Sequence, residues 1–131
     1  MSDNSESLRK PTVLVVEDDE LVLETVLNLI SAGGYKVLQC RNGDDASHLL
    51  VNDPDIGLLF TDIFLNGGMN GLDLARHAKK IRPDLAILLT SGFPPAALRA
   101  HGIAVESFSF IQKPYGVSTI LALIEKILQS E

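Results

Sequence analysis

Five short apolar segments alternate with five segments of helical periodicity, and this alternation constrains the fold more than any other feature of the sequence. The apolar segments are residues 12–17, 35–40, 56–61, 85–90 and 107–112. The helical segments are residues 21–30, 44–51, 72–81, 95–100 and 117–129. A strand followed by a helix, five times over, predicts parallel strands with right-handed crossovers and helices on both faces. We therefore expect an α/β fold with a doubly wound five-stranded parallel sheet.

Composition limits the class of protein. The chain of 131 residues is 46% hydrophobic and 21% charged, as in ordinary globular domains. We expect a disordered tail over residues 1–10 and one domain over residues 11–131. The single Cys40 excludes an internal disulfide framework and indicates a reducing cytoplasm. A net charge of −6 argues against nucleic acid as a partner, and no apolar run is long enough to span a membrane.

Polar residues stand where the predicted strands end. Asp62 directly follows an apolar strand, and a buried carboxylate is costly unless it is paired, hydrogen-bonded or bound to metal. The other strand ends carry Glu17 and Asp18, Thr90, and Lys113. With the strands in the order 2-1-3-4-5, these side chains converge at the edge where strand order reverses, which is where such sheets bind ligands. Each residue alone could be a helix cap, a turn residue or a solvated strand end, as we expect for Asp19 and Glu20. Their joint placement favours a site.

The charges at this edge predict its chemistry. Glu17, Asp18 and Asp62 would carry −3 against +1 from Lys113, and clustered carboxylates have raised pKa values unless a cation joins them. Mg²⁺ prefers a site of oxygen ligands that leaves places for water and phosphoryl oxygens. Asp62, nearest the centre, could then act as a nucleophile and form an aspartyl-phosphate, while Mg²⁺ and Lys113 offset charge on the transferred group.

The sequence resembles the receiver domain of two-component response regulators, from about Pro11 to Ser130. The resemblance rests on four motifs in order: "VLVVEDDE", "LLFTDIFL", "LLTSGF" and "FIQKPY". It implies a flavodoxin-like sheet of order 2-1-3-4-5 and a phosphorylation-controlled switch. Asp62 would accept a phosphoryl group from a phosphohistidine of a sensor kinase.

The resemblance also implies roles for individual residues. Asp18 would bind Mg²⁺ directly, Glu17 would act through water, and the backbone carbonyl of Phe64 would complete the protein ligands. The Thr90 hydroxyl would move onto the phosphoryl group, and Phe110 is an aromatic placed to fill the space it leaves. Lys113 would contact the phosphoryl group, and its bond to Pro114 is expected to be cis.

These inferences predict a cytoplasmic signalling switch without an output domain of its own. It would catalyse only its own phosphorylation and dephosphorylation, and it would signal through protein–protein contacts or a phosphorelay. Expected partners are a sensor or hybrid histidine kinase, or a histidine phosphotransfer protein. We expect a monomer, or a weak dimer through the fourth helix, the fifth strand and the fifth helix.

Three other functions compete with this interpretation. Phosphatases of the haloacid-dehalogenase type also form an aspartyl-phosphate with Mg²⁺, but their nucleophile follows strand one in a D-x-D arrangement that "EDDE" lacks. A flavodoxin-like cofactor binder needs a Ser/Thr/Gly-rich loop after strand one, where the acidic loop would repel phosphate. A phosphorylation-independent interaction module has no need of the complete acidic set.

The sequence departs from the family pattern at several places. Asn66 stands where many receivers have proline, and the loop "NGGMNG" that begins there is rich in glycine. Phe110 replaces the common tyrosine and has no hydroxyl. The fourth helix, in "FPPAALRAHG", looks short, and the pair of prolines predicts a stiff, nonstandard entry to it. These features resemble receivers of hybrid histidine kinases and of single-domain regulators.

Overall fold

Residues 10–130 contain one parallel sheet of five strands in the order β2-β1-β3-β4-β5, as predicted. The computed structural model describes residues 10–130, so nearly all of the expected tail, residues 1–10, lies outside the described residues. The strands are β1 (Thr12–Val16), β2 (Val37–Cys40), β3 (Ile56–Asp62), β4 (Ala86–Ser91) and β5 (Ser109–Gln112).

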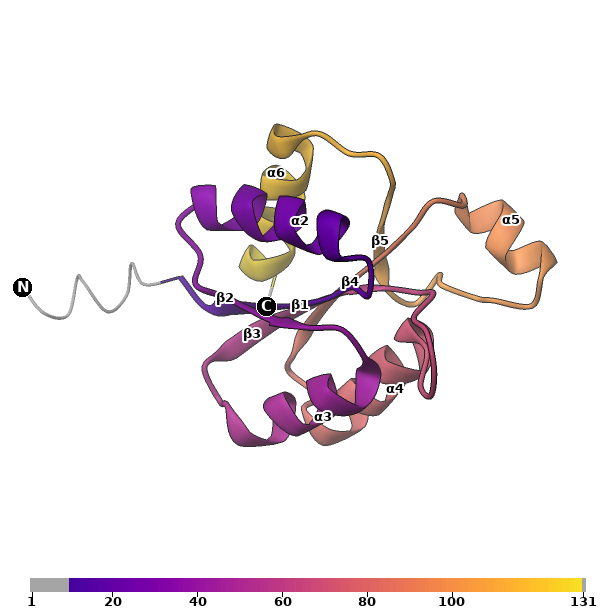
Figure 1. Ribbon diagram of the computed structural model, residues 1–131, viewed down its shortest axis with the longest axis horizontal. Coiled ribbons are helices and arrows are strands. Elements are labelled where there is room, and N and C mark those ends of the chain that lie inside the picture. Colours follow the sequence, from indigo (N-terminus) through magenta and orange to yellow (C-terminus); the bar gives the residue numbers. More distant parts are fainter. Residues whose placement is uncertain (1–9, 131) are drawn as a thin grey trace, which may run out of the picture.

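Helices cover both faces of this sheet (Figure 1). They are α2 (Glu20–Ala32), α3 (Gly43–Asn52), α4 (Gly71–Ile81), α5 (Pro95–Ala100) and α6 (Val117–Gln129). In Figure 1, α2 and α6 lie on one face, α3 and α4 lie on the other, and α5 stands apart beyond the sheet edge. No helix within residues 10–130 is long and apolar enough to cross a membrane.

Alternate residues of the central strands point into two separate cores. Leu59 and Leu89 belong to the core under α3 and α4, whereas Leu58 and Leu88 belong to the core under α2 and α6. All four side chains are fully buried. Burial on both faces is why β1, β3 and β4 are nearly continuous apolar runs in the sequence.

Three of the helices that leave the carboxyl edge of the sheet, α2, α3 and α4, begin with polar side-chain caps. The side chain of Asp19 accepts hydrogen bonds from the N–H groups of Leu21 and Val22 at the start of α2. Asn42 and Asn70 cap α3 and α4 in the same way. Such caps satisfy backbone donors that a helix leaves unpaired. The prediction that Asp19 is a cap is therefore confirmed.

Two of the predicted strands begin two residues later than expected. The segment expected as 35–40 becomes a strand only at Val37, after Gly34 has turned the chain with a φ of 92°. Tyr35 is buried in this turn, and the ammonium of Lys10 lies 4.7 Å from its ring centroid. The segment expected as 107–112 begins at Ser109, because the N–H of Phe108 is bonded to the carbonyl of Val105 in a turn.

Candidate functional site

Asp62 is the last residue of β3, and its carboxylate is almost completely buried. Its residue is 8% exposed and pairs with Thr90 across the β3–β4 ladder. Oδ1 accepts a hydrogen bond from the backbone N–H of Phe64 at 3.1 Å. Oδ2 accepts one from Nζ of Lys113 at 2.7 Å. The buried carboxylate is thus paired and hydrogen-bonded, which is the condition for its burial.

Lys113, which follows β5, joins two carboxylates. Its Nζ lies 2.7 Å from Oδ2 of Asp62 and 2.9 Å from Oε1 of Glu17. Burial lowers the pKa of Lys113, but the hydrogen bonds to Asp62 and Glu17 outweigh it, and the net pKa lies above the ordinary value. The ammonium therefore stays charged at neutral pH. The bond between Lys113 and Pro114 is cis, as predicted.

Glu17 is the second buried carboxylate of the site. Its residue is 4% exposed, and Oε2 accepts a hydrogen bond from the backbone N–H of Asp19 at 3.1 Å. Burial is the main reason that its pKa is raised, the charge of Asp62 adds to the rise, and Lys113 opposes it. Two carboxylates thus share one ammonium. When both are ionised, the cluster carries one more negative than positive charge.

Asp18 does not join this cluster in the structure. Its Oδ2 accepts a hydrogen bond from the backbone N–H of Asn66 at 2.7 Å, in the loop between β3 and α4. Within residues 10–130, no three acidic, histidine or cysteine side chains converge into a group that could hold a metal as they stand. The structure therefore joins Glu17, Asp62 and Lys113, whereas Asp18 bonds to the loop between β3 and α4.

The hydroxyl of Thr90 points into the neighbouring strand. Thr90 is 3% exposed, and its Oγ1 donates a hydrogen bond to the carbonyl of Ile111 at 2.7 Å. Phe110, the residue before Ile111, is half-buried and packs against the core under α3 and α4. Thr90 is thus adjacent to Asp62 in the sheet, while its hydroxyl is committed to β5.

Two features of the site escaped the sequence analysis. A Cβ atom at Gly71 would lie 1.8 Å from the backbone oxygen of Asp62, so only glycine lets α4 begin this close to β3. The rings of Phe64 and Phe93 meet edge to face, with centroids 5.9 Å apart. Gly71 is visible in the sequence only as part of a glycine-rich loop, and nothing in the sequence pairs the two phenylalanines.

Comparison with known proteins identifies relatives over nearly the whole chain. Residues 13–125 match the family model of the response regulator receiver domain. The response regulator receiver protein CpdR of Brucella abortus (strain 2308) is 34% identical over 116 residues, which are 88% of this chain and 95% of that protein. The sensor kinase CckA of the same organism is 24% identical over 121 residues, but the chain covers only 13% of its length.

A solved structure supports the fold. The signal receiver domain of an HD domain-containing protein from Pseudomonas fluorescens Pf-5 superposes with a TM-score of 0.81 at 24% identity. The match covers 93% of this chain and 89% of that one. Several curated relatives are much longer than the chain, which covers 24% of the transcriptional regulator NtrC of Azospirillum brasilense.

Proposed function

We propose that this chain, which belongs to the response regulator receiver domain family, accepts its phosphoryl group on Asp62. Phosphorylation-controlled signalling in two-component systems is the function of this family. One observation carries the assignment to Asp62. Its carboxylate is buried at the end of a central strand, 2.7 Å from the ammonium of Lys113 and beside Thr90 in the sheet.

The proposed reaction transfers a phosphoryl group from a phosphohistidine. An oxygen of the Asp62 carboxylate bonds to phosphorus as the bond between phosphorus and the imidazole nitrogen breaks. The electron pair of the broken bond returns to the nitrogen, and the products are an acyl phosphate and a histidine. Lys113 stays charged during this step, and its ammonium offsets charge on the transferred group.

The carboxylates of Glu17, Asp18 and Asp62 fit Mg²⁺ by their chemistry, because all of their donor atoms are oxygen. The excess of carboxylates over ammonium groups in the buried cluster favours a further cation. We propose that Asp18 and Asp62 bind it directly, with Glu17 acting through water and Phe64 contributing its backbone carbonyl. When bound, Mg²⁺ supplies charge neutralisation for the phosphoryl oxygens. In the structure, Oδ2 of Asp18 accepts a hydrogen bond from the N–H of Asn66.

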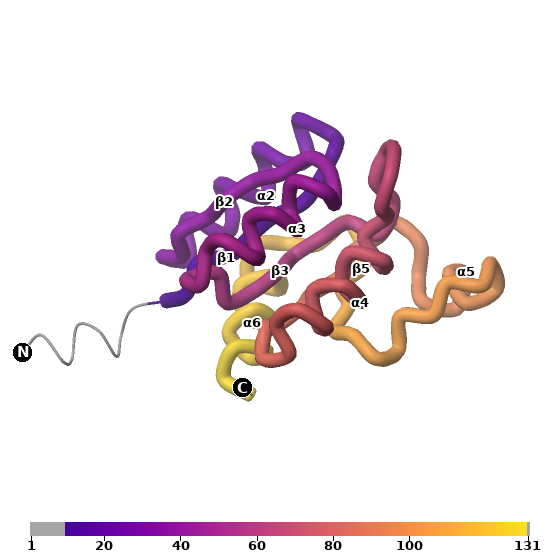
Figure 2. The backbone as a smooth tube through the Cα atoms, turned by 90° about the horizontal axis from the view of Figure 1, so that it is seen from below, coloured from indigo at the N-terminus to yellow at the C-terminus, as the bar shows by residue number. Residues whose placement is uncertain are grey.

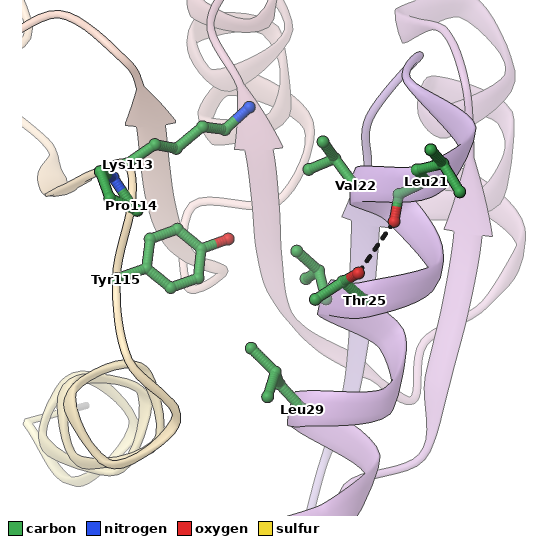
Figure 3. A pocket seen from close by; sticks show the side chains of 8 residues that line it. Leu21, Val22, Thr25, Leu29, Lys113, Pro114 and Tyr115 are labelled. Carbon is green, nitrogen blue, oxygen red and sulfur yellow. Dashed lines mark hydrogen bonds between the residues drawn. The ribbon is translucent and has the colours of Figure 1, made fainter.

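A hollow beside the site suits the partner that brings the phosphohistidine. It has a volume of about 310 Å³ and lies between α2 and the loop after β5 (Figure 3). Its walls are mostly apolar side chains, Leu21, Val22, Val26, Leu29, Pro114 and Tyr115 among them. Lys113 belongs both to this wall and to the Asp62 cluster, so a helix seated here would lie next to the acceptor. We infer that this helix is the histidine-bearing helix of a sensor or hybrid kinase, or of a phosphotransfer protein.

The proposed output begins at Thr90. A phosphoryl group on Asp62 offers the Thr90 hydroxyl a charged acceptor in place of the Ile111 carbonyl. The movement frees space near Phe110, which can shift inward, and the face formed by α5, β5 and α6 then changes its affinity for a protein partner. This is a population shift between two packings in a cytoplasmic module that acts as a monomer or a weak dimer.

Intact mass measurement tests the acceptor. The chain is incubated with acetyl phosphate and Mg²⁺, and we expect a gain of one phosphoryl group. Asp62→Asn abolishes the gain, whereas Asp84→Asn, which changes an exposed aspartate, retains it. Chelating the metal also abolishes it. A gain that persists in Asp62→Asn would overturn the assignment.

A further inference from the structure

A backbone contact ties the loop between β3 and α4 to the connection between β1 and α2. The N–H of Asn66 donates to Oδ2 of Asp18 at 2.7 Å, although the two residues are 48 positions apart. Figure 2 shows this loop projecting away from the sheet. Gly67 and Gly68, next along the chain, have φ values of 67° and 59°, which glycine adopts readily. The chain therefore bends directly after the residue that donates to Asp18.

The donor in this contact is the main chain, so one property of residue 66 matters. Every amino acid except proline has a backbone N–H to offer. The family pattern often has proline at this position, and a proline could not make the contact. Proline cannot adopt a positive φ, and the φ of Asn66 is not positive, so this feature of the backbone does not exclude proline at residue 66. Asn66→Pro therefore removes the donor, and Asn66→Ala keeps it.

The contact engages Oδ2, one of the two oxygens of the Asp18 carboxylate. Within the described part of the chain, the acidic side chains do not converge as a metal-binding group. Glu17 and Asp62 are held together by Lys113, while Asp18 faces the loop. A hydrogen bond to a carboxylate is charge-assisted and stronger than a neutral one. A cation that binds Oδ2 of Asp18 therefore competes with a charge-assisted hydrogen bond.

We propose that Asn66 lowers the affinity of the site for a divalent cation, because its backbone N–H competes with the cation for the Asp18 carboxylate. The inference rests on the proposed function, which places Asp18 among the ligands. Linked equilibria are reciprocal, so occupation of the site by a cation releases the loop. Residues 64–70 then respond to the cation as well as to the phosphoryl group.

If the hydrogen bond supported cation binding instead of competing with it, its removal would change the affinity for the cation in the opposite direction. If the hydrogen bond persisted in the occupied site, it would orient the carboxylate and support binding, as partners of metal ligands commonly do. Removing it would then weaken the affinity for the cation. The direction of the change in Asn66→Pro therefore decides between competition and support.

The experiment is a titration of the full chain with Mg²⁺ alone, followed by amide proton–nitrogen NMR spectra. Asn66→Pro should bind Mg²⁺ about tenfold more tightly than the wild type, the effect of removing one charge-assisted competitor. Asn66→Ala should match the wild type within about twofold, because its N–H remains. In the wild type, the Asn66 amide should shift and exchange with solvent faster as the site fills. Unshifted signals from β1 and β4 in the absence of Mg²⁺ show that the fold of each variant is intact.

Each other result overturns the inference in a recognisable way. Equal or weaker binding by Asn66→Pro, or an Asn66→Ala variant that binds as tightly as Asn66→Pro, contradicts competition while leaving the proposed function standing. An Asn66 amide that stays protected at saturation does the same. If the wild type shows no Mg²⁺-dependent shifts at Glu17, Asp18 or Asp62, the metal site of the proposed function fails together with the inference.

Discussion

The site has two halves that are held by different interactions. The acidic half consists of Glu17, Asp62 and Lys113, and the hydroxyl half consists of Thr90 and Phe110. In the acidic half, one ammonium lies within 2.9 Å of two buried carboxylates, and each carboxylate also accepts a backbone N–H bond. In the hydroxyl half, one neutral hydrogen bond from Thr90 to the Ile111 carbonyl fixes the side chain. Phe110 is only half-buried.

The difference suggests a division of labour. Charge-assisted bonds in a poorly solvated site are strong, so the acidic half is fixed before any phosphoryl group arrives. A neutral hydrogen bond contributes about 1 kcal/mol, which a phosphoryl group can exceed as an acceptor. We therefore expect the acidic half to bind and the hydroxyl half to move. Leu98 of the short helix α5 belongs to the core against which Phe110 packs, so α5 is linked to the half that we expect to move.

Removing the shared ammonium should have the largest effect on stability. Lys113→Met leaves Glu17 and Asp62 facing each other without a counter-charge. We expect the free energy of unfolding to fall by about 2 kcal/mol, less than for a fully buried pair because the Lys113 side chain is 25% exposed. Urea denaturation in the presence of a chelator measures it. Lys36→Met, at an exposed lysine, is the matched control, and an equal effect of the two would mean that Lys113 does not hold the acidic half.

Removing the hydroxyl should cost less stability but should break the output. Thr90→Ala leaves the Ile111 carbonyl without its partner, and we expect a loss of about 1 kcal/mol that Thr90→Ser largely avoids. With beryllofluoride as a phosphoryl analogue, the ring signals of Phe110 should shift in the wild type and in Thr90→Ser, but not in Thr90→Ala. A Phe110 ring that keeps one rotamer while Thr90 moves would show that the signal leaves by another route.

The lifetime of the phosphoryl group tests the edge of the acidic half. Phe64 lies two residues after Asp62, and its ring packs against Phe93. A bulky apolar side chain here should exclude the hydrolytic water, although a Cβ at Gly92, two residues after Thr90, would meet no atom within 4 Å. We expect Phe64→Asn to speed loss of phosphate several-fold, about 1 kcal/mol in the barrier. An unchanged rate would contradict the shielding role of Phe64. The control is Phe93→Leu, which removes the contact between the two rings but keeps the Phe64 side chain, so its rate should stay close to that of the wild type.

The smallest effect concerns the pH dependence of Glu17. Because burial raises its pKa in the folded state above the ordinary 4.5, the protonated form favours folding. The contribution of Glu17 to the free energy of unfolding is fully present below pH 4.5, and it is lost as the pH rises through the folded-state pKa. Glu17→Gln should therefore gain stability relative to the wild type between pH 4.5 and neutral, in metal-free urea denaturation. A difference that does not change with pH would mean that Glu17 is fully compensated by Lys113.

Much of the fold and part of the site could be predicted from the sequence. The apolar runs reveal strands buried on both faces, and parallel strands bring their carboxyl ends to one edge, which is why Asp62, Glu17 and Lys113 meet. The residue types alone predicted a site at which several carboxylates share one ammonium and favour a further cation. These features depend on side-chain identity and on the alternation of elements.

What the sequence did not reveal depends on the main chain. Oδ2 of Asp18 accepts the backbone N–H of a residue 48 positions away, and any residue but proline could supply that donor. The Thr90 hydroxyl likewise binds a carbonyl of β5, which leaves no trace in side-chain identity. The need for Gly71 arises from the approach of α4 to the Asp62 backbone, a contact that spacing alone does not fix.

The central claim is that Asp62 is the residue that becomes phosphorylated, and chemical trapping tests it most directly. The chain is phosphorylated with acetyl phosphate and Mg²⁺ and then treated with borohydride, which reduces an acyl phosphate on aspartate to homoserine. Peptide mass spectrometry then locates the modified residue. We predict homoserine at position 62 and at no other aspartate. Homoserine at position 18 or elsewhere, or a phosphorylated chain with none at position 62, would contradict the account.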